Sequence, residues 1–150
     1  KSLANAGGWD INNSNSTNIT FGAYLRLVIE KNPSLTCSNP NDRFTVSATN
    51  GNGQLKYPIG LLTADEYVFA GARNGTDNNS FYLNNGQNQW SLSPYFFGTD
   101  GFSFSLESTG KLTTNYFYST LGLRPVVSLN KDVTFSSGDG SSSSPYVVGN

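Results

Sequence analysis

Histidine is absent from this sequence of 150 residues, and cysteine occurs only once, at Cys37. Without histidine, neither a Ser–His–Asp triad nor a Cys–His pair can form, so two common hydrolase mechanisms are excluded. A structural zinc site built from cysteine and histidine is excluded for the same reason. One cysteine cannot form a disulfide within the chain, and a lone thiol of this kind is typically a small buried apolar group.

Charged residues are also scarce. The chain has 9 basic and 10 acidic residues, which together make up 13% of it, about half the usual share. Binding to nucleic acid or to an anionic membrane requires clustered basic residues, so we expect neither partner. No apolar run approaches the length of a membrane span, and the opening residues 1–5 lack the apolar core of a signal peptide. Asparagine, serine, threonine and glycine supply the polarity, a composition typical of extracellular, cell-surface and phage domains.

The length predicts a single domain over residues 1–150, and a chain of this size can bury a substantial core. Residues 1–20 form a poorly patterned N-terminal segment. From Phe21 to Lys31, apolar residues at helical spacing predict a short helix, although two adjacent β-branched residues leave a strand as the alternative. Asn32-Pro33 ends this element, because the residue before a proline disfavours helical backbone.

The clearest local signal follows the extended apolar run 57–62. Thr63 and Glu66 form a capping box, in which the Thr63 hydroxyl accepts from the Glu66 amide and the Glu66 carboxylate accepts from the Thr63 amide. Asp65 and Glu66 also lie at the positive end of the helix dipole, so capping is the favoured role for both acids. The helix that follows is expected to end near Gly71 and to bury its apolar residues.

Beyond residue 73 the sequence predicts strands and loops. Phe102, Phe104 and Leu106 alternate with polar residues and are expected to share one sheet face. The segment 108–111 contains Gly110 and predicts a hairpin turn, and 112–118 would be the return strand.

Two more strands are predicted near the C-terminus. The run 123–129 is expected to be a buried strand, which Pro125 places at a sheet edge or a bulge. A tight loop and a short strand over 145–148 follow. Asp139, between two glycines, could ligate calcium through oxygen, but a plain turn is the favoured interpretation. No cofactor is therefore expected.

The most unusual feature is the concentration of aromatic residues. The chain contains 10 Phe, 8 Tyr and 2 Trp, and more than half of these rings lie between residues 81 and 118. Because side chains alternate along a strand, either Phe117 or both Tyr116 and Tyr118 must point away from the core. Exposed rings among Ser, Asn and Gly have the composition of a binding surface. The alternative for any single ring is packing beneath a loop. We expect a ligand surface within residues 87–121.

Two motifs, residues 90–94 (Trp-Ser-Leu-Ser-Pro) and residues 122–129 (Gly-Leu-Arg-Pro-Val-Val-Ser-Leu), carry a family resemblance. Together they resemble the C-type-lectin-fold module related to formylglycine-generating enzymes. That module is used by variable proteins of diversity-generating retroelements and by surface or pilin-like proteins of gut Firmicutes. The resemblance extends over 57–71 and 138–148, and so covers most of the chain from Phe21 onward.

The resemblance implies an α+β fold of two short helices, small twisted antiparallel sheets and long ligand-presenting loops. It implies scaffold roles for Trp90, Leu92, Phe104, Leu106, Leu112 and Val126. The implied ligand-binding residues are Tyr95, Phe96, Phe97, Asp100, Ser103, Ser105, Asn115, Tyr116, Tyr118, Thr120 and Leu121. Enzymes of this fold oxidise through cysteines and bound metal, which Cys37 alone cannot provide.

Together, these observations predict a non-catalytic binding domain, outside the cell or on a phage particle, that recognises a protein or a glycan. Two alternatives stay open. The exposed rings could make subunit contacts in a pilus or filament. A glycan-acting hydrolase could instead use Asp100 and Glu107, which requires their carboxyl groups to lie about 5–10 Å apart.

Overall fold

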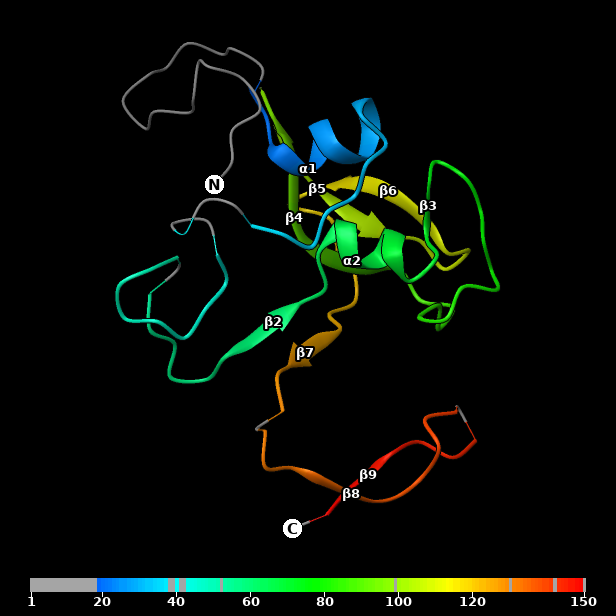
Figure 1. Ribbon diagram of the computed structural model, residues 1–150. Coiled ribbons are helices and arrows are strands. Elements are labelled where there is room, and N and C mark those ends of the chain that lie inside the picture. The colour runs from blue at the N-terminus through cyan, green and yellow to red at the C-terminus, as the bar shows by residue number, and fades with distance from the viewer. Residues whose placement is uncertain are drawn as a thin grey trace.

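The computed structural model describes residues 19–37, 40, 43–51, 53–98, 100–129, 131–141 and 143–149. Residues 1–18 of the poorly patterned N-terminal segment therefore lie outside the described residues. The fold is α+β, as predicted: short helical segments lie against a five-stranded sheet, and two small two-stranded sheets extend away from it (Figure 1). No helix within the described ranges combines the length and the hydrophobicity that crossing a lipid bilayer requires.

The five-stranded sheet has the order β1-β4-β5-β6-β3. Its strands are β1 (Ile19–Thr20), β3 (Arg73–Asn74), β4 (Gln89–Phe97), β5 (Gly101–Leu106) and β6 (Lys111–Tyr116). All neighbours are antiparallel except β3, which runs parallel to β6. The pairing of β4 with β5 shifts register on either side of Pro94. Such irregularities bend a strand and re-aim its side chains.

The hairpin between β5 and β6 confirms the predicted turn. Gly110 has a φ of 76°, and its amide donates to the Glu107 carbonyl at 2.9 Å. A β-carbon at Gly110 would lie 2.1 Å from the Asn78 carbonyl oxygen, so this turn needs glycine for space as well as for conformation. The return strand is shorter than predicted, because β6 ends at Tyr116 and the chain turns over residues 117–118.

Both predicted helices are present. The first comprises α1 (Gly22–Tyr24) and a π-helical turn, η1 (Leu25–Ile29), so the strand alternative for this region is wrong. The second, α2 (Ala64–Phe69), begins with the predicted capping box. The Thr63 hydroxyl accepts from the Glu66 amide at 3.2 Å, and the Glu66 carboxylate accepts from the Thr63 amide at 2.7 Å.

The core lies between these helices and one face of the sheet. Phe104, Leu106, Leu112 and Tyr67 are fully buried, with Leu27 of η1 packed in the same cluster. The alternation predicted for β5 is confirmed at Phe104 and Leu106. Phe102 is only half-buried, because it lies near the end of the strand.

The remaining strands form two small ribbons. In one, β2 (Ile59–Leu61) pairs with β7 (Pro125–Val127), and in the other β8 (Thr134–Ser137) pairs with β9 (Val147–Gly149). The strand predicted over 123–129 is present as β7, and it lies at a sheet edge as Pro125 indicates. The predicted burial is wrong, because Val127 is 62% exposed. In the loop between β8 and β9, Asp139 Oδ1 accepts from the Ser141 amide at 2.9 Å. That hydrogen bond confirms the predicted turn.

Candidate ligand-binding surface

A row of four aromatic rings crosses one end of the five-stranded sheet. Phe96, Phe102 and Tyr116 lie opposite one another on the adjacent strands β4, β5 and β6. Their ring centroids are 6.0 Å apart for the first pair and 4.1 Å for the second. Tyr118, in the turn after β6, continues the row by stacking on Tyr116 at 4.8 Å and 13°. We call these four residues the aromatic row.

The row becomes more exposed along its length. Phe96 and Phe102 are half-buried, Tyr116 is 38% exposed and Tyr118 is 74% exposed. Each pair of rings stabilises the arrangement by about 0.5–1.5 kcal/mol beyond simple burial. Because its neighbour supports each ring, the exposed tyrosines lose little conformational freedom on contact with a ligand.

Two turns meet beside the aromatic row. The amide of Phe117 donates to the carbonyl of Gly101 at 3.1 Å, which joins the turn after β6 to the turn between β4 and β5. The Phe117 ring occupies the space that a side chain at Gly101 would fill, since a β-carbon there would lie 2.4 Å from it. Phe117 and Phe97 are 59% and 36% exposed. Because Phe97 pairs with Gly101 while Phe96 pairs with Phe102, alternation places these two rings on the opposite face of the sheet from the aromatic row.

Asp100 supplies the charge at this end of the sheet. It is exposed and immediately precedes Gly101. The pKa of Tyr118 is raised above its usual value, first by desolvation and then by the negative charge of Asp100 and by Tyr116. Within the described residues, no lysine or arginine forms an ion pair with Asp100.

Two of the predicted ligand-binding residues are buried, and two more are half-buried and contact other parts of the fold. Tyr95 is half-buried and packs edge-on against Tyr24 at 5.1 Å and Phe104 at 5.0 Å. Ser103 and Ser105 are 5% and 0% exposed.

Their polar groups are used within the sheet. The Ser103 hydroxyl donates to the Ser93 carbonyl at 2.8 Å, and the Asn115 amide donates to the Ser105 hydroxyl at 2.8 Å. The predicted ligand contacts of Ser103 and Ser105 are therefore corrected, because their side chains are buried. Tyr95 and Asn115 are half-buried and make contacts within the fold.

Thr120 and Leu121 lie at the other end of the sheet. They border a shallow hollow with Gln87, Asn88 and Ser108. Thr120 follows Tyr118 by only two residues, so the loop that carries Tyr118 leads from the aromatic row to this hollow. The predicted site thus divides. Phe96, Tyr116 and Tyr118 belong to the aromatic row and Asp100 lies at the same end of the sheet, whereas Phe97 lies on the opposite face.

Sequence reasoning missed one member of the aromatic row, Phe102. Alternation correctly places Phe102 on the same sheet face as Phe104. Alternation does not show how far the helices extend over that face, and so it does not predict that Phe102 is only half-buried. Among the scaffold positions, Phe104, Leu106 and Leu112 are buried, whereas Leu92 is 38% exposed.

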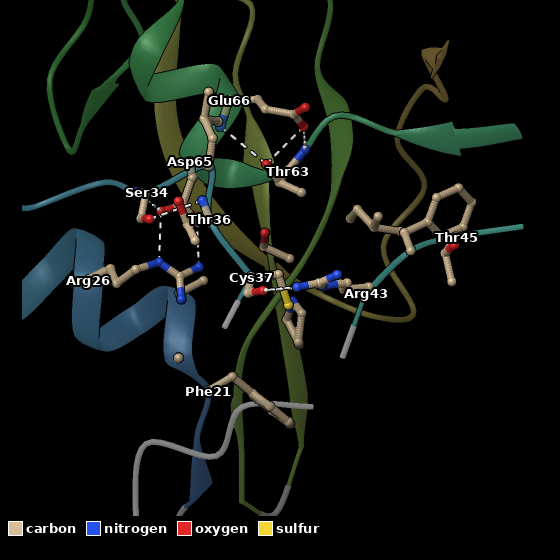
Figure 2. Close-up of a pocket in the computed structure, with 17 residues that line it drawn as sticks. Phe21, Arg26, Ser34, Thr36, Cys37, Arg43, Thr45, Thr63, Asp65 and Glu66 are labelled. Carbon is tan, nitrogen blue, oxygen red and sulfur yellow. Dashed lines mark hydrogen bonds and ion pairs between the residues drawn. The ribbon is translucent and has the colours of Figure 1, made fainter. Parts of the chain in front are cut away.

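A second hollow, of about 490 Å³, lies beside the start of α2 (Figure 2). Arg26 from η1 donates to both carboxylate oxygens of Asp65, at 2.9 and 2.6 Å, and the Ser34 amide donates to the same carboxylate at 2.9 Å. Asp65 lies in the first turn of α2, as expected, and it also joins three segments while only 2% of it is exposed. Since the Glu66 carboxylate is bound by the capping box, the acidic groups of this hollow are already paired within the protein.

The geometry is also incompatible with Asp100 and Glu107 acting as the paired carboxylates of a hydrolase. Asp100 precedes β5 and Glu107 follows it, so their backbones are about 20 Å apart at the usual rise of a strand. That separation exceeds the 5–10 Å that paired glycosidase carboxylates require. Glu107 instead pairs with Lys111 at 2.8 Å.

Comparison of this chain with protein-family models, with curated proteins and with solved structures finds no match.

Proposed function

We propose that this chain is a non-catalytic binding domain that recognises a protein or glycan ligand through the aromatic row. The observation that carries the proposal is the stack of Tyr116 on Tyr118, which holds two exposed rings in fixed positions on a sheet. Rigid, exposed tyrosines give a ligand large contact area at low entropic cost.

The same proposal extends to the family and the setting. We infer a C-type-lectin-fold variable protein of a diversity-generating retroelement, displayed on a cell surface or a phage particle. The small antiparallel sheet, the two helical segments and the loop that carries Tyr118 support this inference. A genomic observation tests it: a near-copy of the codons for residues 87–121, differing only at adenines, should lie beside a reverse transcriptase gene.

Substitution of the two exposed tyrosines tests the binding proposal. The purified domain and its Tyr116→Ala and Tyr118→Ala variants are applied to a glycan array and to a panel of immobilised cell-surface proteins. We expect each variant to weaken binding of any captured ligand by about 1–4 kcal/mol, as substitutions of central interface rings do.

The matched control is Tyr82→Ala, because Tyr82 is also a strongly exposed tyrosine, 80% accessible, but lies outside the aromatic row. It should leave binding unchanged. Circular dichroism and urea denaturation establish whether each variant is folded. Unfolding of the Tyr116 and Tyr118 variants, or an equal loss of binding from Tyr82→Ala, would overturn the proposal.

One observation favours a filament subunit as a second candidate. The two small ribbons expose apolar residues that a subunit contact would cover: Ile59, Val127, Phe135 and Val148 are each more than half exposed. Exposed apolar surface of this kind favours association. Sedimentation velocity over a range of concentrations tests this candidate, and a monomer at the highest concentration would exclude it.

A further inference from the structure

The outer face of Tyr118 is an open aromatic surface. One face of the ring lies on Tyr116, at 4.8 Å and nearly parallel. Since the residue is nevertheless 74% exposed, the opposite face is accessible to a partner. The π-electron density makes such a face negative, so it attracts cations more strongly than neutral groups.

A negative charge lies at the same end of the sheet. Asp100 adjoins Gly101, whose carbonyl accepts from the amide of Phe117, the residue next to Tyr118. The carboxylate of Asp100 therefore lies within electrostatic reach of the Tyr118 ring. Between residues 87 and 121 the only basic side chain is Lys111, and it is already paired with Glu107.

Arginine is the side chain that matches both features. Its planar guanidinium stacks on aromatic faces and donates two parallel hydrogen bonds to a carboxylate. A neutral sugar could stack on the ring and donate hydroxyl hydrogen bonds to Asp100, but it carries no positive charge to pair with the carboxylate. An acidic sugar would be repelled by Asp100. We propose that the ligand is a protein that places an arginine on the outer face of Tyr118 and pairs it with Asp100. This inference rests on the proposed function and specifies its ligand class.

The test uses N-acetyl-arginine amide as the probe, and N-acetyl-citrulline amide as its neutral counterpart of nearly equal shape. Each is titrated into the ¹⁵N-labelled domain while amide shifts are followed by NMR. We expect arginine to shift the amides of residues 100–102 and 116–118, with citrulline binding several times more weakly. Methyl glycosides are titrated as the glycan probe.

Variants then separate the two contributions. Asp100→Asn and Tyr118→Leu should each weaken arginine binding by about two- to fivefold, the usual size of an exposed ion pair or cation–π contact. Tyr118→Phe keeps the ring and should retain binding. Asp132→Asn, which also removes one exposed negative charge but lies in the loop between β7 and β8, should have no effect.

Three results would overturn the inference: equal binding of citrulline and arginine, shifts caused by the glycosides alone, or no effect of Asp100→Asn. These results are distinct from failure of the proposed function. If the Tyr116 and Tyr118 variants lose array ligands while arginine does not bind, the binding surface stands and its ligand class is different. If those variants lose nothing on the arrays, the proposed function itself fails.

Discussion

Replacing Asp65 by asparagine should destabilise this fold far more than replacing an exposed acid. The Asp65 carboxylate lies at the start of α2 and accepts three hydrogen bonds, two from Arg26 and one from the amide of Ser34. Asparagine has nearly the same shape, but one of its two acceptors becomes an amide that faces the guanidinium. Arg26 then loses its counter-charge, and the contact between η1 and α2 loses its polar anchor.

The magnitude follows from the burial of the two partners. Removing one member of a buried pair costs about 3–5 kcal/mol. The Arg26 side chain is 31% exposed whereas that of Asp65 is 3% exposed, so water compensates part of the loss at Arg26. We therefore expect a decrease of about 2–3 kcal/mol in the free energy of unfolding. For a domain of this size, that corresponds to a Tm lowered by about 5–10 °C.

Urea denaturation followed by circular dichroism measures this change, and a double-mutant cycle assigns it. Arg26→Met should also be destabilising, because it leaves a buried carboxylate with only the Ser34 amide. The double variant should lose about 1–3 kcal/mol less than the sum of the single variants, because the two residues act as a pair. Glu30→Gln, on an exposed acid that directly follows η1, is the matched control. A loss below about 0.5 kcal/mol for Asp65→Asn would refute the reasoning, since that is the range of ordinary surface substitutions.

Three further predictions concern the capping box, the hairpin and the buried tyrosines. Thr63→Ala should lower the free energy of unfolding by about 1 kcal/mol, measured in urea, because α2 loses its cap. Gly110→Ala should lower the free energy of unfolding more than Thr63→Ala does, because the new methyl group collides with the Asn78 carbonyl. The Tm of the two variants measures the difference. Burial raises the pKa of Tyr67 and Tyr95 above 10.0, so the unfolded chain ionises first and stability should fall as the pH rises above 10. A pH titration of the denaturation midpoint measures this, and Phe at both positions should reduce the fall.

Local interactions account for the parts of the fold that the sequence predicts. The capping box joins residues three positions apart, the hairpin turn closes over four residues, and strand alternation fixes the face of Phe104 from its immediate neighbours. Each of these signals is complete within a few residues, so no knowledge of the tertiary arrangement is needed.

Long-range pairing explains what the sequence does not show. Arg26 and Asp65 are 39 residues apart, and no local pattern connects them. The burial of Ser103 and Ser105 was missed for a related reason: small polar side chains on an alternating strand indicate a solvent face, whereas their hydroxyls here are paired with other strands. The irregular pairing of β4 likewise determines which of its rings face the core, and the sequence does not reveal its position.

The loop that carries Tyr118 is attached to the sheet through its backbone at both ends. At one end the Phe117 amide bonds to the Gly101 carbonyl, and at the other Gly122 exchanges backbone hydrogen bonds with Asn88 and Trp90. None of these bonds involves a side chain. The side chains between the two attachments can therefore be exchanged while the path of the chain is preserved, so the surface of this loop can change at little risk to folding.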